Sequence, residues 1–380
     1  MNTVKTFHYK LKPNKTQESM LNQWLGTCRY LYNVALEYKK LTYEQKGISL
    51  SKYDLIKELP NVKKTEGFEW FKNVPSQTLQ AVIERLDNSY QRFFRFGTGF
   101  PKFAKKHKYK SFLIKQGVEI WENCIKLPKI GLIKFFNSRP VESKIKNATI
   151  RKEADGWYIS LVFEGKTKEL NPIDKETGLD LGLKYFGVTS NDEKIDNPRT
   201  YRKYQKVLAK AQRVFSRTKK GSNNRKKVSE KIAKIHQKIS NVRKDFLSKT
   251  STKLISENQA IVVEDLQISN LLKNPKPIVH ESGKGYKKNG KSKKTGLNKS
   301  ILDAGWGMFT NMLEYKAKWC GRVFVKVAPN YTSRDCSNCG FRLEKLALSI
   351  RQWECPQCFV IHDRDTNASK NILKKWKESL

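Results

Sequence analysis

Three acidic residues lie far apart in the sequence, in contexts that could bring them together. Asp180 lies in TGLDLGLKYFGVTS (residues 177–190), where leucines alternate with glycines and the acid, as in a β-hairpin. Glu264 ends a short β-branched run, and Asp365 lies in DRDTNAS, where we expect a helix to open. A lone acid in a strand is usually an edge residue or a turn anchor, so each acid alone is weak evidence. Together, in this order, they indicate a metal site.

A strand-borne Asp, a strand-end Glu and a helix-borne Asp are the components of an RNase H-like nuclease centre. Two divalent cations bridging such carboxylates would clamp a phosphodiester, one activating the attacking water and the other stabilising the leaving oxygen. Mg²⁺ suits this site because it prefers carboxylate oxygens and keeps several waters. The glycines on either side of Asp180 would let something bulky, such as a phosphate or a metal, approach the backbone. We therefore predict that Asp180, Glu264 and Asp365 are catalytic and bind magnesium.

Four of the seven cysteines form two Cys-x-x-Cys pairs with fifteen residues between them. This spacing is typical of a zinc ribbon, in which four thiolates close a tetrahedral structural site. Disulfides are disfavoured in a chain that we expect to be cytosolic. A redox role is disfavoured because both pairs look like turns. The predicted zinc ligands are Cys336, Cys339, Cys355 and Cys358. Cys28 lies on an apolar helical face and is expected to be an inert core thiol.

The charge of the chain points to a polyanionic partner. Lysine and arginine number 76 against 36 acids, giving a net charge of +40 and an isoelectric point near 9.9. Nucleic acid fits this excess better than a membrane does. No apolar run is long enough to span a bilayer, and the N-terminus lacks the apolar core of a signal peptide. We expect a cytoplasmic protein, associated with a bacterial nucleoid.

The N-terminal half alternates between strand and helix patterns. Residues 4–11 alternate as a strand, whereas residues 17–35, 51–59 and 76–94 carry apolar side chains at helical spacing. The short strand-like segments of residues 112–163 predict a small barrel. Between helix and barrel, aromatic side chains mix with lysines that include Lys102 and Lys105. This mixture fits either a barrel core with a solvated lysine face or, as we favour, stacking and phosphate contacts with nucleic acid.

Residues 201–256 predict two antiparallel helices joined near residues 220–223, with far more basic than acidic side chains. A charge run is usually a solvated face, but an excess of this size favours contacts with a nucleic-acid backbone. The candidate contacts are Lys206, Lys210, Arg213, Arg225 and Lys226.

Residues 271–300 are rich in Gly, Lys and Ser and show no periodicity. They predict a flexible basic loop, which could be either an active-site lid or an insertion without a role. A helix is predicted over residues 304–317 and a buried strand over residues 323–327.

The helix predicted from residue 76 opens with polar residues that could read a duplex. Ser76 and the preceding proline fit an ordinary helix start. Gln77 and Gln80 are three residues apart and share a face, and glutamine can pair bidentately with adenine in a major groove. We therefore expect that Ser76, Gln77 and Gln80 contact a short motif in duplex DNA.

These motifs together resemble the TnpB proteins of bacterial insertion sequences, which look like compact ancestors of type V CRISPR effectors. The resemblance rests on GLDLGLK, VVEDL, the two cysteine pairs and DRDTNASKNI, and it continues in LDAGWGMF and GFPKFAKKHKYKSF. It covers almost the whole chain. It implies an RNA-guided DNA endonuclease, with Asp180, Glu264 and Asp365 as the metal-binding acids. Asp365 is preferred to Asp363 because the family motif places the acid two residues before Asn367.

The implied fold has α/β parts beside separate α and β parts. A RuvC nuclease domain of RNase H type carries an inserted zinc ribbon, and a wedge β-barrel carries an inserted helical recognition domain. The expected segments are the first barrel strand (1–12), the recognition domain (13–95), the wedge barrel (96–172), the RuvC domain (173–334), the zinc ribbon (335–360) and the RuvC C-terminal helix (361–380).

The implied partners are a guide RNA derived from the transposon end and a target double-stranded DNA. Two other functions compete with cutting. A catalytically silent RNA-guided repressor is disfavoured because all three acids are present. A guide-independent transposase would be supported if no RNA co-purified with the protein.

Overall fold

The computed structural model describes residues 2–141, 143–167, 169–280 and 285–380. The chain divides into two compact units, residues 1–166 and residues 167–380. The finer division into six segments stays a prediction.

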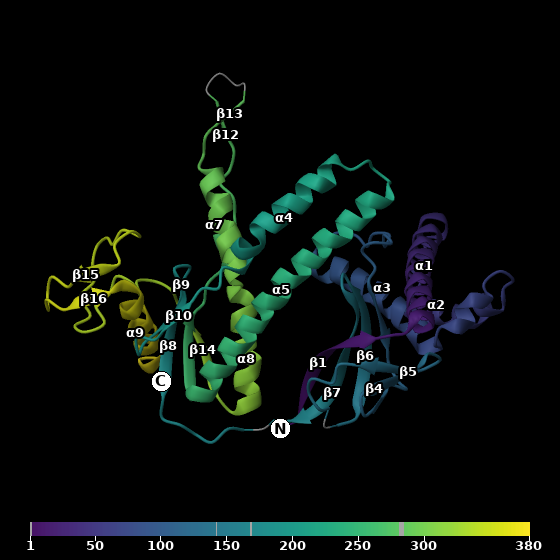
Figure 1. The fold of residues 1–380 in the computed structure, drawn as a ribbon, viewed down its shortest axis with the longest axis horizontal. Helices are drawn as coiled ribbons and strands as arrows, with labels where there is room; N and C mark the ends of the chain where they lie inside the picture. Colours follow the sequence, from purple (N-terminus) through teal and green to yellow (C-terminus); the bar gives the residue numbers. More distant parts are fainter. Residues whose placement is uncertain (1, 142, 168, 281–284) are drawn as a thin grey trace. The chain divides into compact units, whose positions relative to one another are not determined.

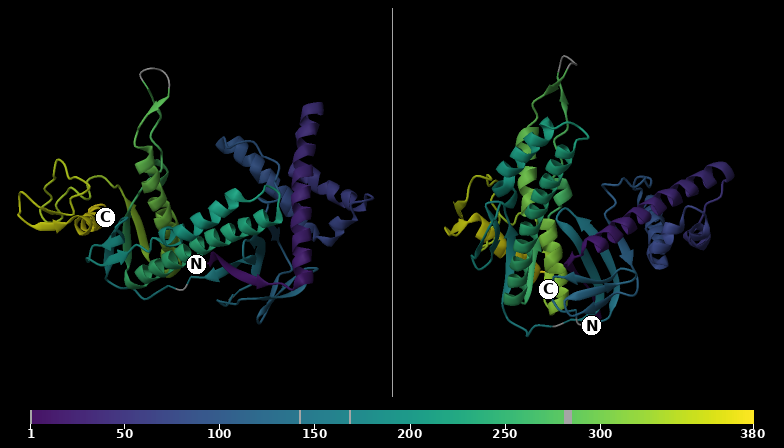
Figure 2. Two further views of the ribbon diagram at one scale, coloured as in Figure 1. Left: turned by 45° about the horizontal axis from the view of Figure 1, so that its top comes forward. Right: turned by 45° about the vertical axis from the view of Figure 1, so that its right-hand side comes forward.

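An antiparallel sheet of seven strands organises the first unit, in the order β2-β6-β7-β1-β5-β4-β3. The long central strand β1 pairs with β7 along most of its length and with β5 at its C-terminal end. The sheet curves around its core as a barrel does (Figure 2). The strands are β1 (Asn2–Lys12), β2 (Ser111–Ile114), β3 (Glu119–Trp121), β4 (Cys124–Leu127), β5 (Gly131–Phe135), β6 (Ile145–Glu153) and β7 (Gly156–Lys166).

Helices pack against this sheet, and they run longer than the sequence pattern predicts. A capping box begins the first helix, in which Asn14 and Gln17 each accept the other's backbone N–H. Trp24 is buried and its ring lies 5.7 Å from that of Phe112 on β2. Burial raises the pKa of the Cys28 thiol to about 12, which confirms an inert core thiol. The helices are α1 (Lys15–Lys46), α2 (Lys52–Lys64), the 3₁₀ helix η1 (Glu69–Asn73) and α3 (Ser76–Phe96).

The second unit is built on a mixed five-stranded sheet with the order β10-β9-β8-β11-β14. The predicted hairpin is present as the antiparallel pair β8–β9, and β11 lies parallel between β8 and β14. Strand β8 is therefore central, with the antiparallel strands β9 and β10 on one side and the parallel strands β11 and β14 on the other, as in RNase H-like sheets. The strands are β8 (Glu176–Leu181), β9 (Tyr185–Thr189), β10 (Lys194–Asp196), β11 (Ala260–Glu264) and β14 (Val323–Val327).

The two faces of this sheet carry different residues. On one face Leu179 and Val263 pack in one apolar cluster with Phe309 of helix α8 (Trp306–Cys320). On the other face Val262 packs with Trp376 of helix α9 (Arg364–Lys377). Asp180 alternates with the leucines of β8 and so lies on the α9 face.

Gly178 explains how closely α9 approaches that face. A Cβ atom built on Gly178 would lie 2.1 Å from the carbonyl oxygen of Ser369 and 2.8 Å from the backbone nitrogen of Leu373. The glycine therefore admits the backbone of helix α9. The expectation that it admits a phosphate or a metal is wrong, because the helix already fills that space.

The two basic helices are α4 (Thr200–Arg217) and α5 (Asn223–Glu257), which lie side by side and run in opposite directions, as predicted (Figures 1 and 2). Ser222 caps α5 by accepting the N–H of Arg225. The Arg225 guanidinium donates to the Phe215 and Thr218 carbonyls at 2.8 and 2.7 Å. It thereby fastens the turn between the helices.

Three predictions in residues 271–327 are wrong in detail. The basic segment is not structureless throughout, because a short hairpin of β12 (Ile278–Val279) and β13 (Tyr286–Lys287) leads into α7 (Lys291–Ala304). Residues 281–284 lie outside the described part of the chain. Gly305, with φ 73°, separates α7 from α8, so the helix predicted over 304–317 begins two residues later, at Trp306. Strand β14 is an edge strand with Val323 41% exposed, and is not buried.

Candidate active site and metal centre

The carboxyl ends of two parallel strands place Asp180 and Glu264 next to each other. Gly178 lies opposite Val262 and Leu179 opposite Val263, so the next register position joins the two acids. Because side chains alternate across a strand, both acids share the face on which α9 packs. Asp365 lies in the first turn of α9, which contacts β8 along this face. All three acids thus come from adjoining elements.

The acids share an excess of negative charge. Burial, together with the charges of Glu264 and Asp365, raises the pKa of Asp180 to about 8. Burial also raises the pKa of Glu264, although a hydrogen bond from Thr332 and the charge of Lys375 oppose the rise. Clustered carboxylate oxygens are the ligands that a hard divalent cation prefers. The donor set therefore fits magnesium.

Asp363 and Asp365 have different roles in the structure. The Asp363 carboxylate caps α9 by accepting the backbone N–H groups of Asp365 and Thr366, both at 3.1 Å. Burial opposes ionisation of Asp363, but these bonds and the Lys194 ammonium hold its pKa below the usual range. Asp363 thus serves as a helix cap, and Asp365 is the acid whose charge acts on Asp180.

Two neighbours of the acids carry no sequence signal. The Arg351 guanidinium donates to Asp365 at 3.1 Å, and the Thr332 hydroxyl donates to Glu264 at 2.6 Å. Both residues lie in segments without periodicity, so nothing in the sequence links them to the acids. Among the described residues, the oxygens of the three acids do not converge as tightly as the cysteine sulfurs do.

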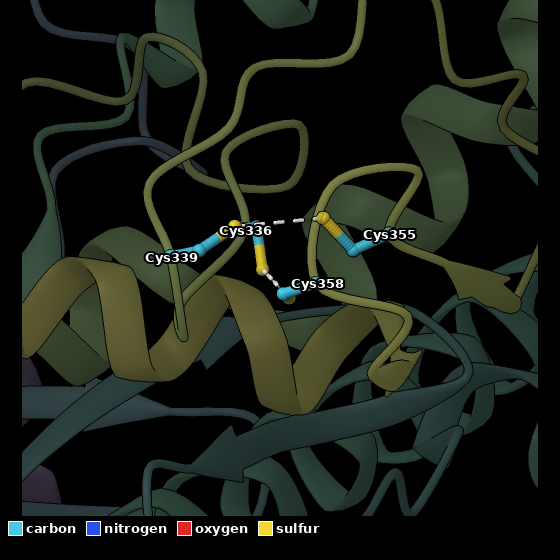
Figure 3. A group of neighbouring side chains, drawn as sticks. All are labelled: Cys336, Cys339, Cys355 and Cys358. Carbon is cyan, nitrogen blue, oxygen red and sulfur yellow. Dashed lines mark hydrogen bonds between the residues drawn. The ribbon is translucent and has the colours of Figure 1, made fainter.

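The four predicted cysteines converge on one point (Figure 3). Their sulfur atoms all lie within 4.8 Å of one another, with 3.6 Å between Cys336 and Cys358 and between Cys339 and Cys355. Each Cys-x-x-Cys pair forms a tight turn whose next residue adopts a positive φ, 82° at Gly340 and 59° at Phe359. Four sulfur donors in such turns form a metal-binding group of the structural type.

Short strands and a histidine support the second turn. Strands β15 (Gln352–Glu354) and β16 (Ile361–Asp363) pair antiparallel around it. His362, which is 7% exposed, places its Nε2 atom 3.0 Å from the Cys336 sulfur and packs its ring on Trp353. The second turn is thereby joined to the first through a side chain outside the cysteine set.

The proposed duplex-reading residues lie on α3 with contacts of their own. The Ser76 hydroxyl accepts a hydrogen bond from the Lys63 ammonium at 2.6 Å. The Gln77 amide donates to the side-chain oxygen of Gln116 at 2.8 Å. Gln80 is partly buried. Pro75, and not Ser76, precedes the first turn, and it makes no side-chain cap.

The proposed backbone contacts are mostly solvent-exposed. Arg225 is the exception, because its guanidinium is bonded to the α4–α5 turn. A cavity of about 510 Å³ lies beside the N-terminus of α4, with Lys184, Arg199 and Lys299 in its lining. Its one acid, Asp303, is paired with Arg243 at 2.8 Å. The exposed candidates are Lys102, Lys105, Lys206, Lys210, Arg213 and Lys226.

We expect one tightly bound zinc ion per chain in freshly purified protein, measured by elemental analysis. Cys336→Ser removes a thiolate from the closed site, so zinc content should fall and the ribbon should lose its thermal transition first. Cys124→Ser changes a cysteine outside the group and should leave the zinc content unchanged. Zinc-free wild-type protein would contradict the assignment.

The charge excess also predicts a pH-dependent cost to stability. Asp180 binds its proton more tightly in the folded chain, at about pH 8 against an ordinary 3.8. Its contribution is therefore full below pH 4 and lost as the pH rises through 8. Without added magnesium, Asp180→Asn should raise the free energy of unfolding at pH 9 by at least about 1 kcal/mol.

The two proteins should approach each other in stability near pH 4, because Asp180 is then neutral in the folded chain and only beginning to ionise in the unfolded chain. Denaturant titrations at pH 4, 6.5 and 9 measure this difference. A constant difference across the three pH values would show that the carboxylate is not in a repulsive, buried setting.

Three family profiles match the chain. One described as "Probable transposase" matches residues 160–275, one described as "Cas12f1-like, TNB domain" matches residues 306–372, and one described as "Helix-turn-helix domain" matches residues 1–47. The last description does not fit the observed structure, in which residues 2–46 form one strand and one uninterrupted helix. No helix in the described ranges combines the length and apolarity needed to cross a bilayer.

Similarity to whole proteins extends over nearly the entire chain. "Putative RNA-guided DNA endonuclease InsQ" of Escherichia coli K12 is 34% identical over 98% of this chain and 92% of its own length. A relative of the same description from Streptomyces pristinaespiralis is also 34% identical, over 97% and 88%. The solved Cas12f1–sgRNA–target DNA complex shares the fold, with a TM-score of 0.58 at 12% identity over 98% of both chains. The chain therefore belongs to the TnpB family of insertion-sequence proteins, with a RuvC-type fold that carries a zinc-ribbon domain.

Proposed function

We propose that this protein is an RNA-guided DNA endonuclease that cuts by magnesium-dependent phosphodiester hydrolysis. The observation that carries the proposal is the placement of Asp180, Glu264 and Asp365 on adjoining elements at one face of the RuvC-type sheet. Partly buried carboxylates held close together are characteristic of a cation-binding catalytic site. The relatives named as RNA-guided DNA endonucleases support the same reading.

The three acids would hold magnesium, which when bound supplies the activation of water and the stabilisation of the leaving oxygen. The chain's own contribution is positional. Strands β8 and β11 fix two carboxylates through their parallel register, and the cap at Asp363 fixes the helix that carries the third. Arg351, at 3.1 Å from Asp365, offers a cation to a phosphate oxygen or holds the acid in place between turnovers.

In this proposal a guide RNA, derived from the transposon end, binds the basic helices and barrel. Base pairing would then supply the sequence specificity, while the protein reads a short duplex motif. Ser76, Gln77 and Gln80 remain our candidates for that motif. Lys102 and Lys105 remain candidates for backbone contacts, and the cavity beside α4 offers a further basic site.

One profile description favours a second function, that of a transposase. A guide-independent transposase and an RNA-guided nuclease differ in whether the purified protein carries RNA. Sequencing of co-purified nucleic acid would distinguish them: RNA of defined length with a variable 3′ end supports the nuclease, and its absence supports the transposase.

Asp180→Ala should retain guide RNA and target DNA binding but lose cleavage by at least about a thousandfold, since the carboxylate would hold metal and touch no base. Binding is measured by gel shift and cleavage by single-turnover kinetics on guide-matched DNA. Asp174→Ala, an acid outside the cluster, is the matched control and should cut normally. A comparable cutting rate for Asp180→Ala would contradict the assignment of the nuclease centre.

Neutralising Lys206, Lys210, Arg213 and Lys226 together should reduce the slope of log affinity for RNA against log salt concentration. Each exposed cation that touches a phosphate releases counterions on binding, so its loss lowers the slope by about one. Filter-binding titrations at salt concentrations from about 50 to about 400 mM measure the slope. An unchanged slope would mean that these side chains face solvent in the complex.

A further inference from the structure

A buried polar chain joins the candidate catalytic glutamate to the cysteine ribbon. It begins at the Thr332 hydroxyl, which donates to the Glu264 Oε1 atom at 2.6 Å. Thr332 is 3% exposed and lies in the segment that leads from the end of β14 to the first cysteine turn. This bond engages one of the two carboxylate oxygens of Glu264.

Helix α9 holds that segment through two asparagines one turn apart. The Asn371 amide donates to the carbonyls of Thr332 and Asp335, at 2.8 and 2.6 Å. The Asn367 amide donates to the Asp335 carbonyl at 2.8 Å, and its oxygen accepts the N–H of Ser337 at 2.9 Å. The asparagines are 5% and 2% exposed, so both amide groups are largely shielded from water.

This series of hydrogen bonds ends at the four-cysteine group. Ser337 follows Cys336 directly, and the Cys336 N–H donates to the Phe341 carbonyl at 2.8 Å within the first turn. Asp335 is held from the other side by a two-point ion pair with Arg342, at 2.6 and 2.9 Å. A metal ion that fixes the first cysteine turn would therefore also fix the Thr332 and Asp335 carbonyls, which accept hydrogen bonds from the two asparagines.

We propose that Thr332 is a positioning residue for Glu264, and that through Asn371 and Asn367 the cysteine ribbon sets the orientation of this catalytic carboxylate. The inference rests on the proposed nuclease function. It assigns the ribbon a part in metal binding at the acids, beyond its role in folding. Thr332 touches neither substrate nor metal in this scheme, and it acts only through the carboxylate it orients.

The physical basis is that a carboxylate free to rotate binds a cation less well than one held in a single rotamer. Partners that orient a metal ligand typically change metal affinity by ten- to a hundredfold when they are removed. The Thr332 bond is charge-assisted, and the side chain that donates it is buried. Hydrogen bonds to an ionised acceptor are stronger than those between neutral groups. Its loss would also leave Glu264 Oε1 as a buried acceptor without a donor.

Thr332→Val tests this directly, because valine keeps the shape and removes the hydroxyl. We expect Mn²⁺ affinity, measured by titration of free Mn²⁺ by electron paramagnetic resonance, to fall roughly tenfold. Asp180→Ala defines the sites that do not belong to the acids, and its binding is subtracted. Full-length, zinc-loaded protein is used throughout, and zinc content should equal that of the wild type.

Thr332→Ser restores the hydroxyl and should recover most of the affinity. Thr65→Val is the matched control, because its hydroxyl donates to the backbone carbonyl of Asn61, far from the acids in the sequence. The magnesium concentration for half-maximal cleavage should rise in parallel in Thr332→Val, while gel-shift affinity for guide and target stays unchanged. Asn371→Ala should raise the magnesium concentration for half-maximal cleavage by a smaller factor, since the Thr332 backbone loses a hydrogen bond but the hydroxyl remains.

Three results would overturn the proposal. Wild-type Mn²⁺ affinity in Thr332→Val would show that the hydroxyl does not orient the carboxylate. Loss of zinc from that variant would show that Thr332 supports the ribbon instead. Wild-type behaviour of Asn371→Ala would remove the link to helix α9 and the ribbon. If the wild type itself failed to cut guide-matched DNA, the proposed function would fall, a result separate from these metal-binding outcomes.

Discussion

The nuclease-type unit depends on the close approach of helix α9 to strand β8. Gly178 permits it, since a single methyl group there would lie 2.1 Å from the Ser369 carbonyl oxygen. The same helix carries Asp365 toward the strand acids and presents Asn367 and Asn371 to the cysteine ribbon. One backbone contact therefore sets both the spacing of the acids and the seat of the ribbon. A larger side chain at Gly178 would push helix α9 away from β8. Because the helix moves as a rigid body, Asp365 and the cysteine ribbon would both be displaced from the strand acids.

The acids lie in a setting that opposes folding. Burial and like charges both raise the pKa of Asp180, so the unit bears an electrostatic cost wherever the three groups are ionised. The surrounding bonds act on position more than on charge: a cap at Asp363, a hydroxyl at Glu264 and a guanidinium at Asp365 each fix one acid or its element. A site built this way is held ready for a cation at the expense of stability without one.

The sequence reveals those features that follow from local spacing. The alternation around Asp180 predicts its strand and face, and two Cys-x-x-Cys pairs predict the convergent sulfurs, because both signals lie within a few residues. Features that depend on distant partners stay hidden. The sequence around Gly178 suggests a glycine that faces a ligand. Its actual neighbour is the backbone of Ser369, which local spacing cannot reveal because it lies far away in the sequence. Thr332 sits in a segment without periodicity, and its bond to Glu264 depends on tertiary packing. Arg225 reads as one more basic residue, although it fastens the α4–α5 turn.

The contact between Gly178 and Ser369 also bears on how the unit folds. These residues lie roughly 190 positions apart, so the contact closes one of the longest loops in the chain. Contacts of such sequence separation form slowly, because the entropy of closing the loop is lost before any packing energy is gained. Strands β8 and β11 and helix α9 must all be in place before the three carboxylates share one face. A partly folded second unit in which any of these three elements is undocked would thus hold separated acids.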